Sequence, residues 1–200
     1  MLQDRDDGPG QNPSPVDEGE PAERRLIGRI AAGDLRAFEQ FYRAYHARLT
    51  RFLDRMTRRH GLVDEVLNDT MLVVWNRSDR FDGSSKVSTW IFAIAYRKAL
   101  KALQRHDEAV PDETLADRPE PGAGPEQQAQ TGQVKVQLVR ALDALSIDHR
   151  TVVELTYFHG MGYREIAQIV DCPVDTVKTR MFHARRRLRT LLAGDAEDWL

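Results

Sequence analysis

The stretch YREIAQIVDCPVDTVKTRMFHARRRL, residues 163–188, places hydrogen-bonding and cationic side chains on a helix that follows a turn at Asp171-Cys172-Pro173. Threonine, histidine, lysine and arginine can bond the base edges and phosphates of a DNA duplex. The candidates for such contacts are Thr176, Lys178, Thr179, Arg180, His183, Arg185, Arg186 and Arg187. A short helix, a turn and a basic second helix together predict a helix-turn-helix whose second helix fits the major groove.

The arginines also have a plainer explanation, because cations favour the negative end of a helix dipole. A helical bundle with a solvated basic face would show the same residues, but the helix-turn-helix spacing favours DNA binding. Cys172 stands at a turn position where an apolar residue would pack. A buried small hydrophobe is therefore the preferred interpretation of this cysteine, and a redox sensor is the alternative.

A second group of candidates lies upstream, in a predicted helix over 88–105 and the polar loop before it. Aromatic rings between cations suit bases that have left the duplex, because rings stack on bases and cations hold the backbone. Gly83 would permit a tight turn in the loop. Trp90 and Tyr96 could equally be partly buried core aromatics. The candidates on the helix for contact with separated strands are Trp90, Arg97, Lys98 and Lys101, and the loop residues that could form a polar pocket beside them are Arg80, Phe81, Asp82, Ser84, Ser85 and Lys86.

An acidic stripe precedes this group on a predicted helix over 62–77. Its members, at i, i+1, i+4 and i+5, are Asp64, Glu65, Asn68 and Asp69. Such a stripe would repel DNA, so it favours a basic protein partner. The alternative is an ordinary solvated face, since acids are favoured near the N-terminus of a helix.

The hydrophobic periodicity of the chain predicts helices and no strands. The predicted ranges are 34–59, 62–77, 88–105, 134–145, 148–157, 163–170 and 173–192. The apolar stripe predicted for 34–59 begins at Leu35, and the one predicted for 173–192 consists of Val177, Met181, Ala184, Leu188 and Leu191. A break at His60-Gly61 is expected between the first two, and Ser88 or Thr89 is expected to cap the third. The predicted fold class is all-α: two small helical domains joined by a flexible acidic linker, the second domain containing the helix-turn-helix.

Charge and composition set the predicted domain boundaries. Residues 1–23 and 106–133 each hold seven acids and one arginine, so the remainder of a chain with net charge −2 is strongly basic. The boundaries are a disordered acidic tail (1–21), a first domain (22–105), a flexible linker (106–133), a second domain (134–192) and a short acidic tail (193–200). Two basic bodies of this kind indicate a polyanionic partner.

Several classes of function find no support in the sequence. A single cysteine excludes an internal disulfide and a cysteine-rich zinc site. The histidines form no i, i+4 pair, so neither a metal nor another cofactor is expected, and the chain is not expected to be an enzyme. No apolar run is long enough to cross a bilayer and no signal sequence is visible, which predicts a cytoplasmic protein without membrane insertion. A free-standing regulator with an effector-sensing N-terminal half would leave the acidic stripe unexplained.

Two segments resemble one protein family. DEVLNDTMLVVWNRSDRFDGSSKVSTWIFAIAYRKALKALQR resembles region two of the extracytoplasmic-function (ECF) sigma factors, which form group IV of the bacterial sigma-70 family. ALDALSIDHRTVVELTYFHGMGYREIAQIVDCPVDTVKTRMFHARRRLRTLL is similar to their region four. The resemblance covers about 22–105 and 134–192, in the order of the family.

The resemblance implies a specificity subunit that binds core RNA polymerase and directs promoter-specific initiation. It assigns polymerase docking to the acidic stripe, through Glu65, Asn68 and Asp69. The loop from Arg80 to Lys86 and the helix after it would melt and hold the −10 element, and the helix-turn-helix would read the −35 element as duplex. An anti-sigma factor or another regulator is an expected partner.

Overall fold

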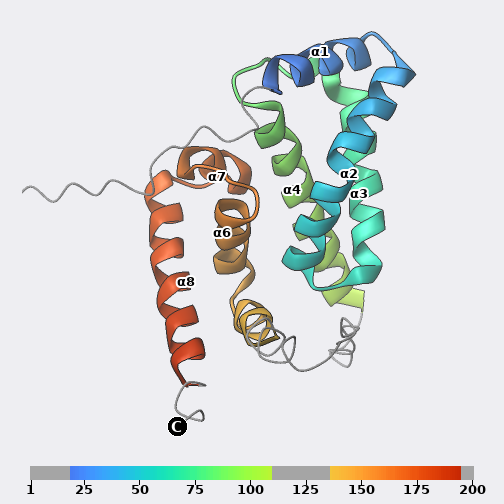
Figure 1. Cartoon of the computed structure of the whole chain (residues 1–200). Helices are drawn as coiled ribbons and strands as arrows, with labels where there is room; N and C mark the ends of the chain where they lie inside the picture. Colours follow the sequence, from blue (N-terminus) through green and yellow to red (C-terminus); the bar gives the residue numbers. More distant parts are fainter. Residues whose placement is uncertain (1–18, 110–135, 195–200) are drawn as a thin grey trace, which may run out of the picture.

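The computed structural model describes residues 19–109 and 136–194, and it is helical with short turns and no strand in those ranges (Figure 1). Most of the predicted acidic tail (1–21), linker (106–133) and C-terminal tail (193–200) lies outside the described residues. In the described residues no helix is both long enough and apolar enough to cross a bilayer. The same residues contain no group of three or more histidine, cysteine, aspartate or glutamate side chains arranged to hold a metal.

The first unit consists of four α-helices and one short 3-10 helix. These are α1 (Glu20–Ala31), α2 (Leu35–Thr57), α3 (His60–Arg77), η1 (Ser78–Arg80) and α4 (Val87–Ala109). In Figure 1, α2, α3 and α4 run side by side and α1 crosses one end of them. All four helices contribute to the core of the unit.

Helix α2 shows how the sequence specifies this unit. Apolar residues three and four positions apart bury one face, and Phe41, Tyr45 and Phe52 are fully covered. Asp34 caps the N-terminus by accepting hydrogen bonds from the N–H groups of Arg36 (2.9 Å) and Ala37 (3.1 Å). The bond from Ala37 is the largest cause that holds the pKa of Asp34 below its usual value, and Arg29 lowers it further.

Three details of the predicted helices are wrong. The break between α2 and α3 falls at Arg58, which has a left-handed backbone with φ of 58°, while His60 and Gly61 lie inside α3. Ser88 and Thr89 do not cap α4, because the helix begins at Val87 and both side chains are buried. Leu35, which begins the predicted apolar stripe of α2, is 67% exposed.

The second unit begins with helical residues 136–143 and continues with α6 (Ile147–Tyr157), α7 (Tyr163–Val170) and α8 (Val174–Gly194). Ser146 caps α6 through its side-chain oxygen, which accepts from the N–H of His149. Asp171 ends α7 with a left-handed backbone, and α8 begins directly after Pro173. The predicted helix-turn-helix is confirmed, with Pro173 just outside the second helix.

The two units pack against each other, which the sequence did not predict. Helix α4 lies against α7, and α2 lies against α6. One hydrophobic cluster runs through both units, which Figure 1 shows as two neighbouring groups of helices. Across this contact Arg150 donates a hydrogen bond of 2.8 Å to the carbonyl of Met56 at the end of α2. Burial lowers the pKa of the Arg150 guanidinium to about 10, because the charged form is poorly solvated there.

Candidate nucleic-acid interface

Helix α8 buries one face and exposes the opposite one. Val177, Met181 and Ala184 lie on the buried face, as predicted, and pack on α6 and α7. The predicted duplex contacts that are exposed to solvent are Lys178, Thr179, His183, Arg185, Arg186 and Arg187, and Thr176 is half-buried. The exposed face therefore offers hydroxyl, imidazole, ammonium and guanidinium groups along a single helix, as a major-groove reader requires.

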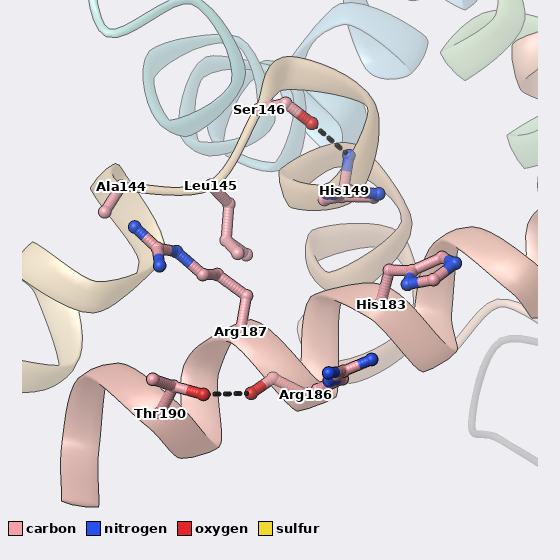
Figure 2. Close-up of a pocket in the computed structure, with 8 residues that line it drawn as sticks. All are labelled: Ala144, Leu145, Ser146, His149, His183, Arg186, Arg187 and Thr190. Atoms are coloured by element: carbon pink, nitrogen blue, oxygen red, sulfur yellow. Dashed lines mark hydrogen bonds between the residues drawn. The ribbon is translucent and has the colours of Figure 1, made fainter.

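A cleft of about 430 Å³ adjoins this face, between α8 and the start of α6 (Figure 2). Its lining residues are Ala144, Leu145, Ser146, His149, His183, Arg186, Arg187 and Thr190. The rings of His149 and His183 lie 6.2 Å apart, and the Arg187 side chain extends toward Ala144 and Leu145. None of these eight residues is acidic, so the cleft suits the phosphates that border a major groove.

Two residues of α8, Arg180 and Phe182, have surroundings that the sequence analysis did not anticipate. Arg180 is turned toward the first unit and donates a hydrogen bond of 2.9 Å to Asp148. Burial raises the pKa of the neighbouring Tyr96 phenol, and the Arg180 guanidinium partly offsets that rise. Phe182, which the sequence reasoning missed, is 63% exposed between Thr179 and Arg186. Phe182 lies three residues after Thr179 and four before Arg186, and this helical spacing could have indicated that it shares their exposed face.

The loop before α4 is held by α1. Arg24 donates hydrogen bonds of 3.1 Å to the carbonyls of Gly83 and Ser85. Glu20 accepts from Arg24 at 2.8 Å and from the N–H of Val87, the first residue of α4, at 3.2 Å. Gly83 has φ of 74°, and a Cβ there would lie 2.6 Å from the guanidinium of Arg24.

Within this loop the Asp82 carboxylate accepts a hydrogen bond of 2.9 Å from the N–H of Ser84. That bond is the first cause that lowers the pKa of Asp82. Sequence reasoning found the loop but missed Glu20 and Arg24. The predicted ranges include no helix over α1, and Glu20 falls in the predicted disordered tail (1–21), whereas Glu20 begins α1 because its carboxylate bonds Arg24 and the N–H of Val87.

Only some of the residues that were predicted to bind separated strands are exposed to solvent on α4 and the loop before it. Arg97 and Lys101 are exposed, and Arg80, Asp82 and Ser84 are exposed on the loop before the helix. Trp90 is half-buried, with its ring 5.3 Å from that of Phe81. Tyr96 is only 5% exposed because the second unit covers it, so its interpretation as a core aromatic holds in this arrangement.

The acidic stripe of α3 lies beside the cations of α4. Glu65 accepts a hydrogen bond of 2.9 Å from Arg105, and Asp69 pairs with Lys98 at 3.1 Å. Asp64 and Asn68 are exposed. The surface around the stripe therefore carries both signs of charge, because two of its acids form ion pairs with cations of the neighbouring helix.

Polar contacts between the units also engage predicted site residues. Lys86, at the end of the loop, lies 3.4 Å from the carboxylate of Glu165 on α7. Arg180 of α8 lies against α6 and close to α4. The packed arrangement therefore engages a predicted −10 residue, Lys86, and a predicted −35 residue, Arg180, in two separate ion pairs, and their side chains stay 38% and 24% exposed.

Comparisons with known proteins match both units. A family model described as "Sigma-70 region 2" matches residues 41–109, and one described as "Sigma-70, region 4" matches residues 135–188. Together the two matches cover more than half of the chain, and each falls on one of the two helical units.

Curated relatives are similar over most of the chain. The ECF RNA polymerase sigma-E factor of Haemophilus influenzae is 26% identical over 176 residues, which is 83% of this chain and 93% of the relative. The protein of the same name from Escherichia coli (strain K12) is 28% identical over 173 residues, 82% of this chain and 90% of the relative.

Solved structures share the arrangement of helices. CnrH in complex with the cytosolic domain of CnrY is 26% identical, with a TM-score of 0.65 over 87% of this chain and 99% of that chain. The sigma factor RpoE of Bartonella quintana, solved with the anti-sigma factor NepR, is 25% identical, with a TM-score of 0.62 over 78% of this chain and 96% of that chain.

Proposed function

Because the chain belongs to the ECF sigma factors of the sigma-70 family, we propose that its two units divide promoter recognition between them. The chain binds core RNA polymerase and directs initiation at specific promoters. The second unit reads the −35 element as duplex, and the first unit docks on the polymerase and holds the melted −10 element.

The observation that supports this division best is the pair of unlike surfaces within one chain. Helix α8 exposes a row of groups that suits intact duplex, including Thr179, His183 and Arg186. The first unit instead offers a loop of fixed backbone beside exposed Arg97 and Lys101. Rigid loops next to aromatic and cationic groups suit bases that have been taken out of the stack.

A transcription assay with purified components tests the function. The full chain is added to core polymerase and a library of promoter-containing templates, and run-off products are mapped. Specific initiation without any other sigma factor is the expected result. A free-standing regulator would give no product until a housekeeping sigma factor is added, and that outcome would reject the proposal.

Polymerase docking is assigned to the stripe formed by Asp64, Glu65, Asn68 and Asp69. Charge reversal at Glu65 and Asp69, written Glu65→Arg with Asp69→Arg, should abolish co-purification with core polymerase. The reason is that the polymerase surface facing the stripe must be basic if it is to attract acids. Circular dichroism checks that the helices remain.

A matched control removes the same number of ion pairs elsewhere. Glu39 pairs with Arg43 and Asp107 pairs with Arg59, so Glu39→Arg with Asp107→Arg reverses two paired acids outside the stripe. This control should bind polymerase as the unchanged chain does. Equal binding by both double variants would reject the docking assignment.

An anti-sigma partner is proposed for the packed arrangement. The solved relatives are in complex with the cytosolic domain of CnrY or with the anti-sigma factor NepR. A partner that spans both units would keep Lys86 paired with Glu165 and Arg180 paired with Asp148, and so away from promoter DNA. Cross-linking of the two units with and without a co-expressed candidate partner measures this effect.

A further inference from the structure

A cleft of about 310 Å³ lies where α2 of the first unit meets the second unit. Three arginines of one helix line one side of it, and α6 with the two residues after it line the other. The lining residues are Arg48, Arg51, Arg55, Glu154, Phe158 and His159. None of them belongs to the predicted polymerase or promoter contacts.

The positive charge of this cleft is only partly compensated. Arg55 pairs with the Glu154 carboxylate at 3.2 Å, and the Glu154 side chain is 2% exposed. In the part of the chain that the structure describes, Arg48 and Arg51 form no ion pair with a carboxylate. The Arg48 guanidinium lies instead over the rings of Tyr45, at 5.1 Å, and Phe92, at 5.7 Å. Among residues 19–109 and 136–194, the guanidiniums of Arg48 and Arg51 therefore have no carboxylate counter-charge beside the cleft.

The positive charges of the three arginines affect the pKa of the neighbouring His159. Its ring meets the edges of Phe52 and Phe92, at centroid distances of 5.9 and 4.8 Å. Burial, followed by the repulsion of the three arginines, lowers the pKa of His159 to about 4. The imidazole is therefore neutral at pH 7 and adds no charge of its own.

We propose that this cleft binds a small anion containing two or three linked phosphate groups. A guanidinium presents paired N–H donors whose geometry matches phosphate oxygens. Arg55 lies seven positions after Arg48 on α2, which at 1.5 Å of rise per residue is about 10 Å. A single phosphate cannot reach across that span, but a short chain of phosphates can. The Phe158 ring, 4.0 Å below the Arg55 guanidinium carbon, holds that end of the row in place.

An anion in this cleft would touch both units at once. The arginines belong to α2, whereas Phe158 and His159 follow α6. A ligand that binds only the packed arrangement stabilises it in proportion to its occupancy. The site would thus hold the two units together without using any residue of the promoter-reading surface, and it stands whether or not the proposed docking assignment is correct.

Titration of the full chain with sodium tripolyphosphate at low ionic strength tests the proposal, with inorganic monophosphate as comparator. Saturable binding of one tripolyphosphate is expected, with monophosphate at least about tenfold weaker. Arg48→Gln with Arg51→Gln should weaken tripolyphosphate binding by roughly a hundredfold, about tenfold for each guanidinium. Arg36→Gln with Arg43→Gln removes the same charge from the same helix outside the cleft and should change little.

A second measurement needs no arginine variant. The ring signals of His159, assigned by comparison with His159→Phe, report its pKa by NMR, and saturation with tripolyphosphate should raise that pKa by about one unit as the field is neutralised. An unchanged pKa, no saturable binding, or equal losses in the two double variants would overturn the proposal. Tighter binding of a short DNA duplex, sensitive to the Arg48 and Arg51 changes, would also overturn it by making the cleft a DNA contact.

Discussion

Replacing Gly83 by alanine should loosen the loop that precedes α4, and the structure supplies the magnitude. An alanine at φ of 74° is strained by about 1–2 kcal/mol relative to glycine. Its Cβ would stand 2.6 Å from the Arg24 guanidinium, so that side chain must move. The move breaks two hydrogen bonds, to the carbonyls of Gly83 and Ser85. Because Arg24 is partly exposed, each bond contributes only about 0.5–1 kcal/mol.

The expected total is a loss of about 2–4 kcal/mol in the free energy of unfolding, measured by urea denaturation. Arg24→Ala separates the two contributions, since in that background Gly83→Ala should cost only the backbone strain, about 1–2 kcal/mol. Affinity for a single-stranded −10 oligonucleotide, followed by fluorescence anisotropy, should fall roughly tenfold, which corresponds to about 1.4 kcal/mol of loop ordering.

Gly28→Ala serves as the control. Gly28 lies inside α1, and nothing lies within 4 Å of an added Cβ. Alanine there should raise stability by about 0.5–1 kcal/mol and leave DNA binding unchanged. If Gly83→Ala cost the same with and without Arg24, the claim that α1 holds the loop would be wrong.

Two further predictions concern the second unit. The pKa of His159 is lowered from 6.5 to about 4, so the folded chain excludes a proton that the unfolded chain accepts. The stability that comes from keeping His159 neutral is therefore fully present above pH 6.5 and is lost as the pH falls toward 4. The free energy of unfolding, measured by urea denaturation, should be about 2 kcal/mol lower at pH 5 than at pH 7.5. In His159→Phe this difference should be smaller. Phe182 is expected to contact a thymine methyl group, since apolar rings make that contact in the major groove. The test replaces each −35 thymine in turn by deoxyuridine, which lacks the methyl group. At one position this change should weaken DNA binding by the unchanged chain but not by the Phe182→Ala variant. Equal weakening of both proteins at that position would contradict the assignment.

The helix-turn-helix was predictable because its signals are local. The apolar spacing of α7 and α8 and the turn at Asp171 each follow from a few neighbouring residues, and the structure has them as predicted. Errors arose where a local preference lost to tertiary structure. Ser88 and Thr89 are good capping residues, yet the N–H of Val87 is met by a carboxylate from α1.

The contact between the units could not be predicted from the sequence. Phe92 and Tyr96 fit an ordinary helical core pattern, and nothing in the pattern shows that α7 supplies part of that core. For the same reason the sequence did not indicate that Arg180, a predicted DNA contact, bonds Asp148 in the free chain. The individual roles of the promoter-contacting residues stay predictions.

The shared core has a consequence for how such a molecule is switched. Moving α4 away from the second unit would remove His159 from the ring of Phe92 and the region of Asp148 and Arg180 from Tyr96, and would expose more of both rings to water. Separating the two units therefore costs free energy, unless a larger macromolecule covers the apolar surfaces that the separation exposes. We therefore expect the two units to stay packed in the free chain and to separate only where a larger binding partner covers the surfaces that separation exposes.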